Sequence, residues 1–160
     1  MKIPKVFILD VDGVLTTGQF LYTAEGKSMK VFGPHDNDGL TLLKNKVKIK
    51  FITADKRGFS ITKKRIVDDM GFELDLISEQ ERFEYIKQNF DLDELIYMGD
   101  GYHDVKILKA CKFGIAPGSA GKEAKEAADF VTEAKAGEGA VLDACLEILK
   151  IFFPGDLKNE

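Results

Sequence analysis

The sequence predicts an α/β domain in which a parallel sheet carries helices on both faces, a Rossmann-like arrangement. Short apolar runs of strand length alternate along the chain with segments of helical periodicity, which is the pattern typical of such folds. The first apolar run, residues 6–9, is uninterrupted, as expected of a strand buried on both faces. No repeat, low-complexity tract or linker divides the 160 residues. We therefore expect a single domain over residues 1–160.

A hairpin, a helix and a second strand are expected after the first strand. The β-prone residues 19–23 and 28–32 flank a turn that contains Gly26, which predicts a β-hairpin. Residues 40–46 have the spacing of a brief amphipathic helix. Residues 49–53, with Ile49, Phe51 and Ile52, predict another buried strand.

The later segments repeat this alternation. Apolar residues between Ile61 and Met70 recur at helical spacing and stop at Gly71, a residue type common at helix C-termini. Ser78 and Glu81 have the spacing of a capping box, so we expect a helix from there to about residue 89. We further expect strands at residues 74–77, 95–98, 113–116 and 130–132, and helices at residues 104–111, 122–128 and 140–152.

Composition restricts the class of partner and the compartment. The formal net charge of −4 and the pI of about 5.3 argue against nucleic acid or a membrane surface as the main partner. Cys111 and Cys145 lie far apart within apolar helical patterns, which favours two reduced, buried thiols. The N-terminal apolar run is too short and too acidic for a signal peptide or a membrane-spanning helix. We therefore expect a cytoplasmic protein.

Acidic side chains gather at the predicted carboxyl ends of the strands. Asp10 and Asp12 come at the end of the first strand, Thr53 ends the second buried strand, and Asp100 and Asp104 follow a later one. Parallel strands bring these ends to one edge of the sheet, where ligands of open α/β folds bind. A set of carboxylates with a hydroxyl and almost no histidine or cysteine suits Mg²⁺ rather than Zn²⁺. The sequence thus predicts a magnesium site at this edge.

Three segments resemble motifs of the haloacid-dehalogenase-like phosphohydrolases. Residues 10–16, with the sequence DVDGVLT, resemble the first motif, residues 52–53 the second, and residues 99–104, GDGYHD, the acidic fourth motif. The resemblance covers essentially the whole chain. It implies a haloacid-dehalogenase core without a cap domain, because only the small hairpin and a helix fill the places where larger relatives insert one.

The same resemblance assigns roles to the motif residues. It implies that Asp10 attacks phosphorus and forms an aspartyl-phosphate, while Asp12 protonates the leaving alcohol and later activates water. Thr53, with the adjacent Ala54, would bind the phosphoryl group. The metal would be held by the carboxylates of Asp10 and Asp100 and the backbone carbonyl of Asp12, with Asp104 of the fourth motif as a further candidate ligand.

The spacing of Asp10 and Asp12 requires a turn. Two residues apart on an extended strand, their side chains would point the same way, whereas their two roles need different sides of the phosphorus. We expect Gly13 to provide the turn that redirects Asp12.

The third motif departs from the family pattern. A lysine usually bridges nucleophile and phosphate in this family, and the alignment places Arg82 at that position. Arginine keeps the charge and adds a fork geometry that fits phosphate, so Arg82 is our candidate for both catalysis and substrate binding. Lys87 is the alternative, although it has the simpler interpretation of a solvated helix charge.

The hairpin and two glycine-containing segments, residues 32–39 and 137–141, resemble the 3-deoxy-manno-octulosonate 8-phosphate phosphatase branch of the family. That resemblance implies a homotetramer whose hairpins and tails close neighbouring sites. His35 and Glu138 stand where the branch carries arginines. His35 is a candidate for substrate contact, while an acid at position 138 cannot hold a sugar-acid carboxylate.

Two further basic groups and one histidine have competing interpretations. Lys56 or Arg57 is a candidate replacement cation, although a solvated surface charge is the simpler interpretation for each. His103 lies within the acidic motif, where we expect it to face solvent or support the site from outside rather than to bind metal.

We expect, from the acids and the capless layout, a Mg²⁺-dependent phosphomonoesterase of surface-polysaccharide (lipopolysaccharide) synthesis. Its substrate would be a small phosphate ester of a sugar or keto-sugar acid. One alternative is a non-catalytic oligomerisation or regulatory module of nucleotide-sugar synthesis, for which Arg82, His35 and Glu138 argue. A phospho-receiver module is a second alternative, but receivers carry an acidic pair on the first strand and accept the phosphoryl group on a later one.

Overall fold

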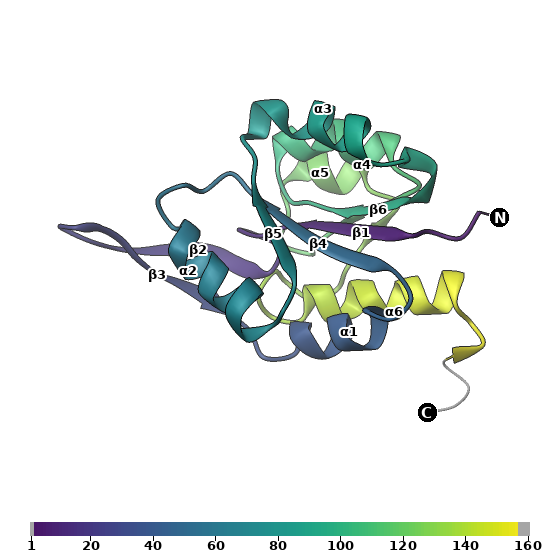
Figure 1. Ribbon diagram of the computed structural model, residues 1–160, viewed down its shortest axis with the longest axis horizontal. Coiled ribbons are helices and arrows are strands. Elements are labelled where there is room, and N and C mark those ends of the chain that lie inside the picture. The colour runs from purple at the N-terminus through teal and green to yellow at the C-terminus, as the bar shows by residue number, and fades with distance from the viewer. Residues whose placement is uncertain (1, 157–160) are drawn as a thin grey trace.

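A six-stranded parallel sheet forms the centre of the molecule. In the computed structural model, which describes residues 2–156, the strands lie in the order β5-β4-β1-β6-β7-β8 (Figure 1). They comprise β1 (Val6–Asp10), β4 (Lys48–Thr53), β5 (Glu73–Leu76), β6 (Leu95–Met98), β7 (Phe113–Ala116) and β8 (Phe130–Val131). The central position of β1 places its carboxyl end between those of β4 and β6, so the three predicted acidic or hydroxyl-bearing strand ends are neighbours.

Helices cover both faces of this sheet (Figure 1). One face carries α1 (Asp36–Leu43) and α6 (Ala140–Phe152), and the other carries α3 (Glu79–Asn89), α4 (Val105–Ala110) and α5 (Lys122–Ala127). This arrangement confirms the predicted α/β fold. Within residues 2–156, no helix is both long enough and apolar enough to cross a membrane.

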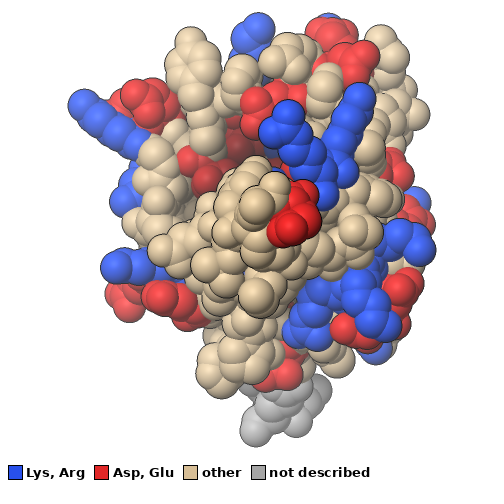
Figure 2. Space-filling view, turned by 90° about the vertical axis from the view of Figure 1, so that its left-hand side faces the viewer, with Lys and Arg blue, Asp and Glu red and all other residues tan. Residues whose placement is uncertain are grey.

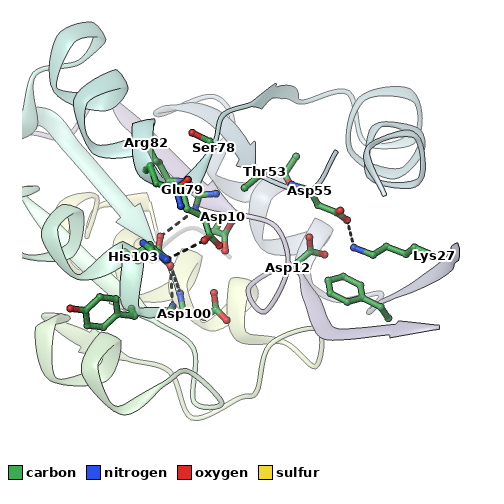
Figure 3. A pocket seen from close by; sticks show the side chains of 16 residues that line it. Asp10, Asp12, Lys27, Thr53, Asp55, Ser78, Glu79, Arg82, Asp100 and His103 are labelled. Carbon is green, nitrogen blue, oxygen red and sulfur yellow. Dashed lines mark hydrogen bonds and ion pairs between the residues drawn. The ribbon is translucent and has the colours of Figure 1, made fainter. Parts of the chain in front are cut away.

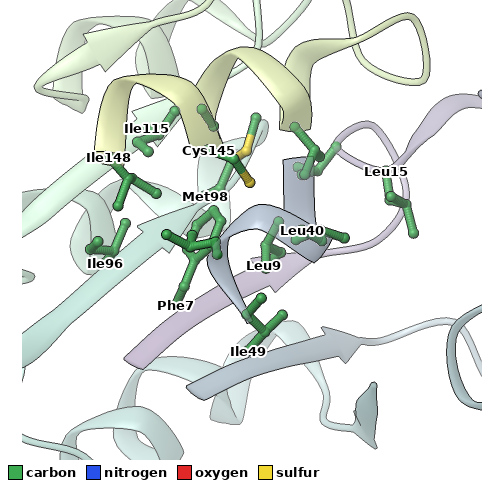
Figure 4. Close-up of a cluster of buried hydrophobic side chains, with 14 of the residues drawn as sticks. Phe7, Leu9, Leu15, Leu40, Ile49, Ile96, Met98, Ile115, Cys145 and Ile148 are labelled. Atoms are coloured by element: carbon green, nitrogen blue, oxygen red, sulfur yellow. The ribbon is translucent and has the colours of Figure 1, made fainter. Parts of the chain in front are cut away.

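The alternating side chains of β1 contribute to two separate cores. Phe7 and Leu9 pack with α1 and α6, where Cys145 is also buried (Figure 4), while Ile8 belongs to the cluster beneath α3, α4 and α5. Full burial of such a side chain contributes about 1.5–3 kcal/mol. The same alternation turns the side chain of Asp10 towards the α3 face, and this sets which helix can reach it.

A two-stranded antiparallel hairpin, β2 (Thr16–Thr23) with β3 (Gly26–Phe32), projects from the edge of the sheet beside α2 (Phe59–Lys63) (Figure 1). The hairpin was expected, and both strands are longer than predicted. Its pairing is irregular between Leu21 and Tyr22. The hairpin is the only segment between the first strand and α1, so no cap domain is inserted there.

Two helices differ from expectation. Helix α1 begins at Asp36 rather than near Leu40, because its first turn is polar and has no apolar periodicity to mark it. The predicted helix up to Gly71 is α2 followed by a π-helical segment, Lys64–Asp69. By contrast, α6 has the predicted bounds, and the Ser78 side chain accepts a hydrogen bond from the backbone N–H of Glu81 as the capping box requires.

Asp36 joins α1 to the beginning of α6. Its Oδ1 accepts hydrogen bonds from the backbone N–H groups of Val141 (3.1 Å) and Leu142 (3.2 Å), which caps a helix whose own N-cap residue is Gly139. The second oxygen, Oδ2, is buried without a partner, and burial raises the pKa of this carboxyl. The cap is therefore made by one of the two carboxylate oxygens, Oδ1.

We expect Asp36→Ala to lower the free energy of unfolding by about 1–2 kcal/mol, because α6 loses its cap. Asp36→Asn keeps the acceptor oxygen and should cost less than half of that. Urea denaturation measures both, with Asp38→Ala, an exposed acid of the same helix turn, as the control that should change little. An equal loss for the Ala and Asn variants would contradict the cap.

Candidate active site

A pocket of about 610 Å³ opens at the carboxyl edge of the sheet, between the hairpin on one side and α3 with the loop after β6 on the other (Figure 3). Seen from the hairpin end, acidic side chains lie in a hollow beside the largely uncharged surface around the hairpin (Figure 2). The pocket is lined by Asp10, Asp12, Phe20, Lys27, Thr53, Ala54, Asp55, Ser78, Glu79, Gln80, Arg82, Asp100, Gly101, Tyr102, His103 and Asp104.

Three carboxylates form the negative centre of this pocket. Oxygens of Asp10, Asp100 and Asp104 all lie within 4.8 Å of one another. Burial, together with the charges of Asp104 and Asp100, raises the pKa of Asp10 well above its usual value, although Arg82 opposes this. Burial and the charge of Asp104 raise the pKa of Asp100 to about 6. The side chains thus leave negative charge uncompensated, and an all-oxygen set of this size suits a hard divalent cation.

Arg82 is the cation that α3 supplies to these acids. Its Nη1 donates to Asp10 Oδ1 (3.1 Å), to Asp104 Oδ1 (3.3 Å) and to the Tyr97 hydroxyl (3.3 Å), and only 4% of its side chain is exposed. The neighbouring acids and Tyr97 raise the pKa of the guanidinium against the effect of burial. Arg82 therefore occupies the position predicted for the third motif. Lys87 is exposed on α3 and does not line the pocket.

Asp104 holds the acidic loop in place. Its Oδ2 accepts from the backbone N–H groups of Asp100 and Gly101, both at 3.0 Å, and its Oδ1 accepts from Tyr97 and Arg82. Four donors thus occupy both oxygens of this predicted metal ligand. We infer that Asp104 mainly orients the loop that carries Asp100, although its oxygen lies in the same cluster.

Gly13 brings the first motif against the fourth. Its φ of +82° belongs to the left-handed region, and a Cβ atom at this position would lie 2.0 Å from Asp100 Oδ2. The carboxylate of Asp12, the residue before Gly13, lies outside the three-acid cluster, on the hairpin side of Asp10 (Figure 3). The carboxylates of Asp10 and Asp12 thus have different neighbours, Arg82 and Lys30 respectively. The Asp12 carboxylate takes no part in the three-acid cluster, which leaves the backbone carbonyl as the Asp12 candidate for the metal.

The hairpin contributes lysines that the sequence analysis did not identify. Lys30 Nζ lies 3.0 Å from Asp12 Oδ2 and 2.9 Å from Asp55 Oδ2. Lys27 Nζ lies 2.7 Å from the same Asp55 oxygen and 3.5 Å from the centroid of the Phe20 ring. Strict strand alternation assigns positions 27 and 30 to opposite faces, but the pairing irregularity in the hairpin allows both to reach Asp55. That irregularity leaves no clear mark in the sequence.

The remaining predicted residues are divided between the pocket and the surface. Thr53 is buried at the end of β4 and Ala54 follows it, and both line the pocket. His103 also lines it; its side chain is half-exposed, and Nε2 lies 3.3 Å from Glu79 Oε2 rather than at the acid cluster. His35 is exposed at the beginning of α1 and does not line the pocket.

The other candidate charges are on the surface. Lys56, Arg57 and Glu138 are exposed and do not line the pocket. Lys56 and Arg57 are thus surface charges, which was the simpler interpretation, and not replacement cations of the pocket. The structure therefore brings together the four motif aspartates, Thr53, Ala54 and Arg82, and leaves His35 apart from them.

Comparisons with known proteins agree with this geometry. The family described as haloacid dehalogenase-like hydrolase matches residues 82–144. The chain is 33% identical over 141 residues to the 3-deoxy-D-manno-octulosonate 8-phosphate phosphatase of Haemophilus influenzae, covering 85% of this chain and 77% of that protein. It is also 28% identical over 156 residues to N-acylneuraminate cytidylyltransferase A of Danio rerio, covering 92% of this chain but 35% of that protein.

A solved structure superposes over nearly the full length. The 3-deoxy-D-manno-octulosonate 8-phosphate phosphatase of Moraxella catarrhalis, in complex with magnesium ion, phosphate ion and KDO, matches with a TM-score of 0.81 and 26% identity. The superposition covers 98% of this chain and 94% of that one. The two chains therefore share the whole fold, including the sheet and the strand ends described above.

We expect Asp55→Asn to lower the free energy of unfolding by about 1–3 kcal/mol at neutral pH, because buried lysines lose their charged partner. Lys27, Lys30 and the backbone N–H of Gly58 lower the pKa of Asp55 to about 2 against the opposing effect of burial. This stabilisation is complete above the unfolded pKa of about 3.8 and is lost as pH falls towards 2.

Urea denaturation of both proteins between pH 7 and pH 3 measures this difference, which should shrink below pH 4. Asp75→Asn removes a more exposed ion pair with Lys50 and serves as the control with a smaller effect. A difference that stays constant down to pH 3 would contradict the assignment.

Proposed function

Since this chain belongs to the haloacid dehalogenase-like hydrolases, we propose that it is a Mg²⁺-dependent phosphomonoesterase for a small phosphorylated sugar or keto-sugar acid. The observation that carries the proposal is the three-acid cluster beside Arg82, with Asp12 a short distance away on the hairpin side. The similarity to two 3-deoxy-D-manno-octulosonate 8-phosphate phosphatases over most of their length supports a substrate of this class.

The proposed reaction has two steps. A carboxylate oxygen of Asp10 forms a bond to phosphorus while the bond from phosphorus to the alcohol oxygen breaks, and the proton of Asp12 passes to that oxygen. Water then attacks the phosphorus of the aspartyl-phosphate and gives a proton to Asp12, and the Asp10 oxygen leaves as a carboxylate. The products are the free alcohol and inorganic phosphate, and general acid–base catalysis of this kind contributes about 10²–10⁴-fold.

The donor set fits the proposed magnesium ion. Asp10 and Asp100 offer carboxylate oxygens within one cluster, and burial and the neighbouring carboxylates raise the pKa values of both, which Arg82 offsets only in part. Asp10, Asp100 and the backbone carbonyl of Asp12 would hold the ion. When bound, it would offset the repulsion between the Asp10 carboxylate and an anionic phosphate ester.

Arg82, Thr53 and Ala54 complete the proposed phosphate end. Arg82 orients Asp10 through the 3.1 Å contact with Oδ1, which leaves the other carboxylate oxygen for phosphorus. Thr53 and Ala54 lie at the end of the neighbouring strand and line the same pocket. Their hydroxyl and backbone groups would bind the phosphoryl oxygens.

A second candidate is a non-catalytic, regulatory or oligomerisation module of nucleotide-sugar synthesis. The match to 35% of the Danio rerio cytidylyltransferase favours it, because this chain corresponds to a minor part of a larger protein. The retention of Asp10, Asp12 and Asp100 in one pocket argues against loss of activity. Stable phosphorylation of Asp10 without release of alcohol would instead indicate a phospho-receiver.

We expect Asp10→Asn to lower phosphate release by roughly 10³-fold or more, because the nucleophile is lost. The measurement is a panel of sugar phosphates and keto-sugar-acid phosphates, assayed with Mg²⁺ and again with a chelator, which should also abolish turnover. Asp38→Asn, an exposed acid on α1, is the control. Absence of turnover with every ester, or full activity of Asp10→Asn, would refute the phosphatase proposal.

We also propose a cytoplasmic homotetramer assembled through the hairpin. Phe20, Leu21, Tyr22, Met29 and Val31 are large apolar residues of the hairpin, each between 39% and 59% exposed. Such an apolar patch is characteristic of a protein–protein interface. Phe20 also lines the pocket, so a neighbouring subunit bound to the hairpin would cover the open site.

We expect Leu21→Asp to shift the protein from tetramer to smaller species in sedimentation or light-scattering measurements, because a charge would be buried in the interface. Leu146→Asp changes an apolar residue of similar exposure on α6 and should leave the mass unchanged. A monomeric wild-type protein would refute the assembly without affecting the phosphatase proposal.

A further inference from the structure

We propose that Lys30 is a positioning residue for Asp12, and that the hairpin thereby orients the group that protonates the leaving alcohol. The inference rests on the phosphatase proposal above. It gives the hairpin a role within its own active site, in addition to any role in assembly.

The Lys30 ammonium is completely enclosed by acceptors. Its side chain is 0% exposed, and Nζ lies 3.0 Å from Asp12 Oδ2, 2.9 Å from Asp55 Oδ2 and 2.8 Å from Thr62 Oγ1. An ammonium group has three N–H donors, and each of them has one partner here. The position of Nζ, and with it that of Asp12 Oδ2, is therefore fixed by three contacts from three separate segments.

The partners of Lys30 are themselves held in place. Asp55 accepts from Lys27 Nζ and from the backbone N–H of Gly58, while the Thr62 hydroxyl donates to the Gly58 carbonyl. A Cβ atom on Gly58 would lie 2.3 Å from Asp55 Oδ2 and 2.7 Å from Lys30 Cε. The contacts between Asp55 and Lys30 therefore need a glycine at position 58. The contacts of Lys30 with Asp55 and Thr62 thus join β3 to α2 and to the segment between β4 and α2.

The two oxygens of Asp12 are consequently different. Oδ2 is bound to Lys30, whereas Oδ1 has a long 3.3 Å contact with Thr16 Oγ1. Oδ1 is therefore the oxygen available to carry the proton. As the bond between phosphorus and the alcohol oxygen breaks, the O–H bond of Asp12 breaks and the proton bonds to that oxygen. The Lys30 charge then stabilises the carboxylate that remains.

A positioning role and a purely structural role predict different results. Loss of a structural ion pair would reduce the hydrolysis of all esters to the same extent. Loss of proton donation matters most when the leaving group is basic, because a weakly basic leaving group departs without a proton. Phenyl phosphate and p-nitrophenyl phosphate provide this contrast, since they share a ring and differ in the basicity of the departing oxygen.

The experiment compares kcat/KM for these two esters, with Mg²⁺, in wild type, Lys30→Met and Asp12→Asn. We expect Lys30→Met to lower kcat/KM for phenyl phosphate by about 10²-fold. The loss of kcat/KM for p-nitrophenyl phosphate should be at least tenfold smaller. Asp12→Asn should change the ratio of the two kcat/KM values in the same direction, and it sets the largest change that loss of proton donation can cause. Lys27→Met is the matched control, because Lys27 shares Asp55 but does not contact Asp12, and its ratio should equal that of wild type.

Circular dichroism checks that each variant folds. If Lys30→Met does not fold, Thr62→Val removes one of the three Lys30 partners, and the same ratio should move in the same direction. An equal loss for both esters, or no loss, would overturn the positioning role while leaving the phosphatase proposal intact. Failure of the wild type to hydrolyse any phosphate ester would instead refute the phosphatase proposal, and this inference with it.

Discussion

The concentration of negative charge at one edge of the sheet is the constraint on which the site depends. Asp10, Asp100 and Asp104 bring carboxylate oxygens within 4.8 Å of one another in a largely buried setting. Buried carboxylates are strongly unfavourable without a cation or a proton, and Arg82 compensates only part of this charge. Burial and the neighbouring carboxylates therefore raise the pKa values of Asp10 and Asp100, and the negative charge that remains makes the edge suitable for a divalent ion.

The two aspartates of the first motif lie in different electrostatic surroundings. Asp10 faces Arg82 and the acid cluster, whereas Asp12 faces Lys30 on the hairpin side. They are only two residues apart, with Val11 between them, at the point where β1 ends and the chain enters the turn at Gly13. A nucleophile and a proton-transfer group need different neighbours, and the fold supplies one basic residue to each.

The hairpin connects the site with the outer surface. Large apolar residues are exposed along its strands, while Lys27 and Lys30 reach inward to Asp55. Because the same strands carry both sets, an assembly formed through the apolar residues would restrict the movement of the lysines.

The sequence by itself determined the α/β fold and the acidic edge, because strand burial and strand-end acids are local patterns that the chain displays directly. The resemblance to the family, aligned on the strand at residues 74–77 and the helix after it, also indicated Arg82. Only the tertiary structure decided the roles of Lys30, Lys27 and Asp55, because their contacts join segments far apart in sequence through an irregular hairpin. The tertiary structure also decided the exposed position of His35, which lies at the beginning of α1. The sequence did not mark this helix start, because the first turn is polar and Asp36 forms its hydrogen bonds with α6, more than a hundred residues away.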